Sequence, residues 1–256
     1  MNKAAPRAHS AVSKVPAVTL SFWIVKIAAT TLGETGGDAV SMSMQLGYLV
    51  GSAIFAVTFL LAATAQIRAR RFHPWLYWLT IIATTTVGTT LADYADRSLG
   101  IGYAGGASLL AMLLLLSLAS WYWSLGSVSV NTVNSPRAEM FYWITIMFSQ
   151  TLGTALGDWT ADTAGLGYTG GAMVFGVLLA MVAAAYLWTR IARTVLFWTA
   201  FILTRPLGAV VGDFLDKPLT QGGLALSRYT ASGALIALII ACILIFPQRP
   251  ASAGAQ

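Results

Sequence analysis

Charged residues are scarce in this sequence. Only 9% of its 256 residues are Asp, Glu, Lys or Arg, whereas a soluble domain carries about 25%. Hydrophobic residues make up 57% and gather in long runs, such as the charge-free segments 109–118 and 234–246. This composition excludes an ordinary soluble domain and predicts membrane-spanning helices.

Cysteine and histidine are almost absent as well. The single cysteine, Cys242, cannot form an internal disulfide. The two histidines, His9 and His73, lie far from most of the acidic residues. No Ser/His or Cys/His set, phosphate-binding loop or cofactor motif is evident, so we expect neither an enzyme nor a bound cofactor.

The apolar runs predict eight membrane helices and no cleavable signal peptide. Their expected positions are about 18–37, 46–67, 75–93, 103–123, 140–158, 167–189, 194–213 and 229–247. Several odd-numbered helices in this order are polar, and we expect them to face protein or water rather than lipid.

The basic residues predict the orientation in the membrane, because cytoplasmic loops are enriched in Lys and Arg. One side would receive Lys3, Arg7, Lys14, Arg68, Arg70, Arg71, Arg137, Arg190, Arg193 and Arg249. The other side would receive only Arg97, Lys217 and Arg228. We therefore expect a bacterial inner-membrane protein with both termini in the cytoplasm. Its net charge of +6 then points to lipid headgroups as partners, not to nucleic acid.

One pattern, aromatic-Trp-x9-Gly-x4-Asp, occurs four times with identical spacing. It comprises Phe22-Trp23…Gly33…Asp38, Tyr77-Trp78…Gly88…Asp93, Tyr142-Trp143…Gly153…Asp158 and Phe197-Trp198…Gly208…Asp213. Each copy would begin a two-helix repeat. Because each repeat contains an even number of helices, all four repeats should point the same way across the membrane.

The spacing of the repeats indicates two successive duplications. The four tryptophans lie 55, 65 and 55 residues apart, so the two halves of the chain are offset by 120 residues. We expect an all-α, polytopic membrane protein whose halves, each of two repeats, are related by a pseudo-twofold axis. The predicted parts are a tail at 1–17, repeats at 18–67, 75–123, 138–189 and 194–247, and a tail at 248–256.

On these motifs the chain resembles a family of bacterial membrane proteins built from four copies of a repeat of unknown function. In that family each repeat has two transmembrane segments and a marker tryptophan, here Trp23, Trp78, Trp143 and Trp198. The resemblance covers about residues 18–247. It implies the architecture and no established activity.

Small residues four apart accompany each motif glycine: Gly33/Gly37, Gly88/Ala92, Gly153/Gly157 and Gly208/Gly212. Such pairs let helix backbones approach closely. They are typical of packing, and they predict that the first helices of the repeats form an inner bundle inside the more apolar second helices.

The motif aspartates should lie near the outer membrane surface, about 22 Å along the helix from the tryptophans. Ionisable residues at that depth are candidates for function. Glu34 lies one turn deeper and has no acidic counterpart in the other repeats. We predict a metal site of Glu34, Asp38 and Asp158, with Asp93 and Asp213 in supporting roles. In repeats 2 and 4 a basic residue four positions later, Arg97 or Lys217, can neutralise the motif aspartate.

Hydroxyl, amide and basic side chains lie along the same helices. The candidate lining residues are Thr31, Thr86, Thr151, Gln150, Arg205 and Lys26. The threonines could equally serve helix–helix hydrogen bonding. We expect Lys26 to extend to the cytoplasmic surface, and Arg205 to pair with a buried carboxylate from another repeat.

These oxygen ligands suit a hard divalent cation such as manganese, magnesium or calcium. Residues 34–38, Glu-Thr-Gly-Gly-Asp, resemble with one extra residue the Glu-x-Gly-Asp signature of a family of manganese/calcium exchangers. We therefore expect a secondary transporter of a divalent cation, favouring export and proton coupling. The alternatives are an exporter of organic cations, or a membrane scaffold in which the acids only hold the bundle together. The oligomeric state stays open.

Overall fold

The computed structural model describes residues 13–251. Residues 1–12 and 252–256, with Lys3, Arg7 and His9, lie outside the described part of the chain. The described residues form eight long α-helices and no β-strand. The helices are α1 (Leu20–Asp38), α2 (Gly47–Arg68), α3 (Pro74–Asp93), α4 (Tyr103–Leu125), α5 (Pro136–Asp158), α6 (Gly167–Trp188), α7 (Arg193–Asp216) and α8 (Arg228–Ile245). The predicted all-α class is confirmed.

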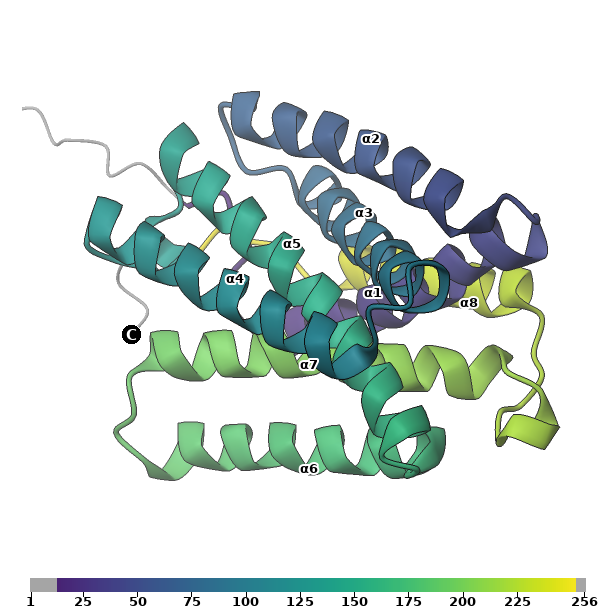
Figure 1. Ribbon diagram of the computed structural model, residues 1–256. Coiled ribbons are helices and arrows are strands. Elements are labelled where there is room, and N and C mark those ends of the chain that lie inside the picture. Colours follow the sequence, from purple (N-terminus) through teal and green to yellow (C-terminus); the bar gives the residue numbers. More distant parts are fainter. Residues whose placement is uncertain (1–12, 252–256) are drawn as a thin grey trace, which may run out of the picture.

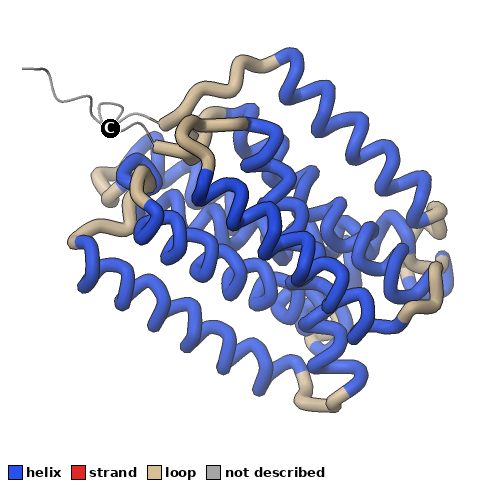
Figure 2. The backbone as a smooth tube through the Cα atoms, turned by 90° about the horizontal axis from the view of Figure 1, so that it is seen from above, coloured by secondary structure: helices blue, strands red, loops and turns tan. Residues whose placement is uncertain are grey.

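The first helices of the four repeats form a closed inner ring. Helix α1 packs against α3 and α7, and α5 packs against the same two helices. Each second helix packs mainly against the first helix of the following repeat: α2 on α3, α4 on α5 and α6 on α7 (Figure 1). Helix α8 completes the circle by packing on α1. Figure 2 shows the same helices from above, joined by short loops.

The motif glycines bring the ring helices together. Each glycine faces the residue that lies three positions before the motif glycine of the next repeat. Gly33 faces Thr85, Gly88 faces Gln150, Gly153 faces Arg205 and Gly208 faces Thr30. At Gly208, an added Cβ would lie 2.8 Å from the backbone carbonyl carbon of Thr30. The small residues therefore permit the close approach that the sequence predicts.

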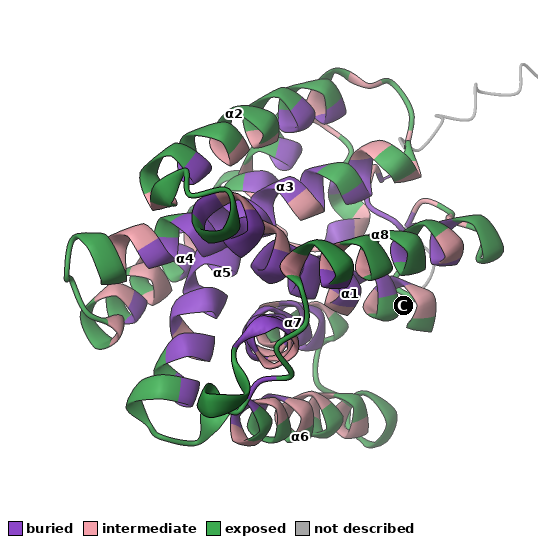
Figure 3. Ribbon diagram, turned by 90° about the vertical axis from the view of Figure 1, so that its right-hand side faces the viewer, coloured by how far each residue is buried: buried purple, intermediate pink, exposed green. Residues whose placement is uncertain are grey.

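Burial separates the ring from the outer helices. Five helices, α2, α4, α6, α7 and α8, are long and apolar enough to cross a membrane. In the most apolar 18-residue stretch of α4 and of α6 only 11% of residues are buried, compared with 67% in the same length of α7. Figure 3 shows this difference in burial. Helices α1, α3 and α5 are less apolar and are not among these five helices. Their polar residues are buried within the ring. The outer helices thus present the apolar surface that lipid requires.

The ring has two chemically different ends, named here for their motif residues. Both described termini lie at the tryptophan end, where Pro16 pairs with Pro250 and the Trp78 indole donates to Gln248. At the aspartate end, α1, α3 and α5 each continue into a five-residue π-helical turn directly after the motif aspartate. Helix α7 instead stays α-helical to Asp216.

Candidate functional site

Equivalent residues of the repeats lie in successive layers across the ring, because the glycine contacts hold all four helices in the same register. Four layers are named after one member each. From the tryptophan end they are the Lys26 layer (Lys26, Ile81, Ile146, Phe201), the Arg205 layer (Thr30, Thr85, Gln150, Arg205), the Glu34 layer (Glu34, Thr89, Thr154, Ala209) and the aspartate layer (Asp38, Asp93, Asp158, Asp213).

Arg205 connects two of these layers and is fully buried. Its Nη2 lies 3.0 Å from Oε2 of Glu34 and also donates to the hydroxyls of Thr89 and Thr154. The Thr89 hydroxyl in turn donates to the same Glu34 oxygen at 3.2 Å. Arg205 therefore pairs with a carboxylate of another repeat, as the sequence predicts, and contacts three of the four members of the Glu34 layer.

The basic residues that follow α3 and α7 each serve two repeats. Arg97 lies 2.8 Å from its own Asp93 and 4.0 Å from Asp158 of the next repeat. Lys217 lies 3.0 Å from its own Asp213 and 2.6 Å from Asp38. The two pairs four residues apart that the sequence predicts are present, and each cation also reaches the aspartate of the following repeat around the ring.

Lys217 lies just beyond the end of α7, and its charge is strongly held. Burial alone would lower the pKa of its ammonium group, but Asp213 and Asp38 together keep that pKa above its usual value. Lys217 therefore stays protonated across the physiological pH range and acts as a fixed positive charge.

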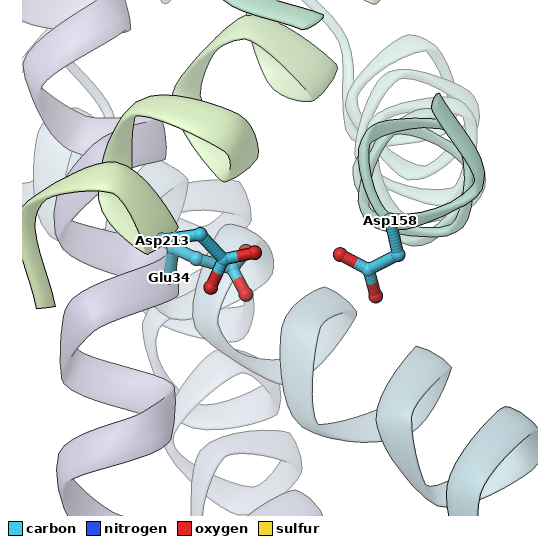
Figure 4. Close-up of side chains that lie close together, drawn as sticks. All are labelled: Glu34, Asp158 and Asp213. Carbon is cyan, nitrogen blue, oxygen red and sulfur yellow. The ribbon is translucent and has the colours of Figure 1, made fainter. Parts of the chain in front are cut away.

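Three sets of carboxylates lie close enough to share a cation. Oxygens of Glu34, Asp158 and Asp213 lie within 4.8 Å of one another, and all three residues are buried (Figure 4). A second set joins Glu34 with Asp38 and Asp93, and a third joins Asp38 with Asp213 and Asp216. Asp213 thus completes the set around Glu34 and Asp158, where Asp38 was expected, and Asp38 meets Glu34 in the second set.

The acids of this cluster outnumber its bases. The carboxylates are Glu34, Asp38, Asp93, Asp158, Asp213 and Asp216, and the cations in ion pairs with them are Arg97, Arg205, Lys217 and Arg228. Fully ionised, the cluster carries two uncompensated negative charges. Asp158 is the least satisfied member, because its only ion pair spans 4.0 Å and its Oδ2 accepts no hydrogen bond from residues 13–251.

The predicted lining residues lie in several places. The hydroxyls of Thr31, Thr86 and Thr151 donate to carbonyls of their own helices. Thr31 also lines an apolar groove with residues of α1, α7 and α8. The threonines that do contact Arg205, Thr89 and Thr154, are the repeat counterparts of Glu34, and that correspondence is the sequence signal that could have found them.

Lys26 does not reach the surface, so that expectation is wrong. Its side chain is fully buried, and its Nζ lies 4.1 Å from the centre of the Phe201 ring. A lysine extends to water only when its helix face is open to solvent or lipid. Because Lys26 belongs to the face that closes the ring, its stem leads inwards.

A cavity of about 470 Å³ opens at the aspartate end. Its lining includes Met42, Arg97, Asp162, Lys217 and Arg228. Since Arg97 and Lys217 also contact the aspartate layer, they lie between this cavity and the buried carboxylates.

The tryptophan end is closed by contacts that our sequence reasoning missed. Lys14 lies 2.6 Å from Glu139, whose side chain is buried, and donates to the carbonyls of Gln66 and Ile67 at the end of α2. Tyr77 and Tyr142 share a hydrogen bond of 2.6 Å between their hydroxyls. Glu139 is the only acid far in sequence from a motif aspartate, which was the available signal.

Comparison with known proteins agrees with the repeat architecture. The family described as "Repeat of Unknown Function (DUF347)" matches residues 21–72, 76–127, 141–192 and 196–247. The chain belongs to the DUF347 repeat family. No curated protein and no solved structure matches it. The four DUF347 segments each contain one ring helix and the outer helix that follows it.

Proposed function

We propose that this DUF347 protein is a secondary transporter of a small divalent cation, with manganese the best candidate. The observation that carries the proposal is the buried set of Glu34, Asp158 and Asp213, whose oxygens lie within 4.8 Å of one another. Carboxylate and hydroxyl oxygens are the ligands that hard divalent cations prefer. The two uncompensated charges of the cluster equal the charge of one such ion.

Charge balance suggests how transport would be coupled. Gathered carboxylates cannot all stay ionised in a poorly solvated bundle unless cations or protons compensate them. A bound divalent cation would do so, and in its absence protons would take its place. Exchange of the two is proton-coupled antiport. Arg205 would supply the fixed counter-charge to Glu34 in either state.

The proposed membrane arrangement has all eight helices spanning the bilayer and a pseudo-twofold axis relating the two halves. The polar helices α1, α3 and α5 would cross while shielded by the outer helices. The tryptophan end with both termini would face the cytoplasm of a bacterial inner membrane. The exchanger-like residues 34–38 favour export. Thiol labels at residues 69–72 should react only from the cytoplasm and labels at 217–222 only from outside, and the reverse pattern would invert the proposed direction.

The other two readings account for less of the geometry. An organic-cation exporter would use the aromatic residues as a lining, but Phe22, Trp78, Tyr142 and Trp198 pack against other rings in the core. A pure scaffold would have no reason to bury two unbalanced charges.

The test is manganese flux into proteoliposomes. Glu34→Gln keeps the shape of the side chain and removes its charge, so flux should fall about 100-fold, the loss expected for a charge-assisted contact of nearly 3 kcal/mol. The matched control Asp96→Asn removes an acid that belongs to none of the three sets and should leave flux near the wild-type rate. Wild-type flux in both variants would mean that the acids are structural, and the absence of protein-dependent flux even in the wild type would support the scaffold reading.

A further inference from the structure

The Arg205 and Lys26 layers contain an excess of buried hydrogen-bond donors. The donors Lys26 Nζ, Gln150 Nε2, the Thr85 hydroxyl, and Nε and Nη1 of Arg205 form no hydrogen bond with any part of residues 13–251, and one acceptor, Oε1 of Gln150, is likewise unpaired there. All four side chains are fully buried. An unpaired buried polar group costs about 1–3 kcal/mol, and a charged one costs more. Several such groups in adjacent layers therefore call for a further hydrogen-bonding partner.

The charges specify the sign of the missing partner. None of the ion pairs formed by residues 13–251 includes Lys26. The Lys26 amine instead lies over the face of the Phe201 ring, one turn before Arg205 on α7. Glu34 engages only Nη2 of Arg205, which leaves the other guanidinium nitrogens without an acceptor. Glu34 already neutralises Arg205, so of these two cations only Lys26 has an unpaired charge. Its N–H groups and the unused N–H groups of Arg205 call for an acceptor of negative charge.

The repeats show that these polar residues are exceptional. The counterparts of Lys26 are Ile81, Ile146 and Phe201, and the position shared by Gln150 and Arg205 holds threonine in repeats 1 and 2. The ring therefore packs with apolar or small residues at these positions. Lys26, Gln150 and Arg205 add donors that the fold does not itself require.

We propose that the Lys26 and Arg205 layers bind one small inorganic anion of halide size, most simply chloride. Lys26 supplies the charge, and the Gln150 amide, the Thr85 hydroxyl and Arg205 supply N–H and O–H donors. The ring helices approach closely at Gly88 and Gly153, next to the Arg205 layer, so a small ion suits this part of the ring better than a large one. This site lies on the tryptophan side of Glu34, and its existence does not depend on cation transport.

The experiment measures thermal unfolding of the purified protein in detergent while sodium chloride replaces sodium gluconate at constant ionic strength. The midpoint should rise with chloride, by about 5 °C or more once chloride exceeds its Kd 100-fold. Sodium bromide should act in the same way. Gluconate is too large for the site and serves as the reference.

Two variants matched to the repeats locate the effect. Lys26→Ile copies Ile81 and Ile146 and should abolish the chloride response. Gln150→Thr copies Thr30 and Thr85 and should weaken it, which keeps the test valid if the first variant does not fold. Thr58→Ala removes an exposed hydroxyl of α2 and should respond like the wild type.

Two results would overturn the anion site. One is a wild-type midpoint indifferent to chloride and bromide, which would mean that Lys26 is buried as a neutral amine. The other is an undiminished response in both Lys26→Ile and Gln150→Thr. Asp158→Asn should keep the chloride response even if it loses the cation, so failure of the proposed transport function would be seen separately.

Discussion

The two ends of the inner ring are built by the same four helices, yet they differ in almost every property. At the aspartate end, buried carboxylates are interleaved with Arg97, Lys217 and Arg205, beneath a cavity of about 470 Å³. At the tryptophan end, aromatic rings pack together and the Lys14–Glu139 pair joins the segment before α1 to helix α5. The repeat sets the register, and the residue types at each layer decide whether that layer is charged or closed.

Differences between the repeats carry most of the chemistry. Glu34 and Lys26 each occupy a position where the other repeats have threonine, alanine or an apolar residue. Gln150 and Arg205 occupy the same position in repeats 3 and 4, where repeats 1 and 2 have threonine. A ring of identical repeats would be a neutral bundle at these layers. The charges of these layers therefore come from single residues in single repeats, while the close contacts at the motif glycines occur in all four repeats.

The largest effect should follow from unbalancing the aspartate end. Arg205→Gln copies Gln150 but leaves Glu34 buried without its cation, and the loss of one partner of a buried pair costs about 3–5 kcal/mol. The double variant Glu34→Thr/Arg205→Gln copies repeat 3 at both positions and should recover most of the stability while transport stays lost. Urea or thermal unfolding measures the stability of both variants, and liposome flux measures their transport. Equal stability of the single variant and the wild type would mean that this ion pair contributes nothing.

A smaller loss should come from the close packing beside Glu34. An added Cβ at Gly212 would lie 2.6 Å from the Cβ of Glu34, and overpacking costs about 1–3 kcal/mol. Gly212→Ala should lower the unfolding midpoint and weaken cation binding together. Gly176→Ala on the outer helix α6 meets open space and should stabilise by up to about 1 kcal/mol, since alanine favours helix. If both variants changed the stability in the same direction, the distinction between ring and outer helices would be lost.

The smallest effect is expected at the tryptophan end. Glu139→Gln removes the charge opposite Lys14, which is itself partly exposed, so the loss should be about 1 kcal/mol. Metal binding at the aspartate end should be unchanged, because the two regions share no contact residues. A decrease in manganese affinity in this variant would show that the ends are coupled.

The sequence predicted the helices and the inner ring for a clear physical reason. Apolar length and the small-residue pairs are local properties, so they can be read along the chain. The order of helices around the ring is not local. Without it, the pairing of Lys217 with Asp38 and the place of Asp213 beside Glu34 could not be inferred. The same holds for Lys26, whose direction depends on which face of α1 closes the ring.

The most direct measurement of the central claim is manganese binding to the purified protein at neutral pH, by equilibrium dialysis or by the loss of the free-ion EPR signal. The wild type should bind one ion per chain with release of protons. Asp158→Asn should lose this binding, while Asp162→Asn, the matched change at the cavity wall, should retain it. A wild-type protein that binds no divalent cation, or an Asp158→Asn variant that binds as well as the wild type, would contradict the account.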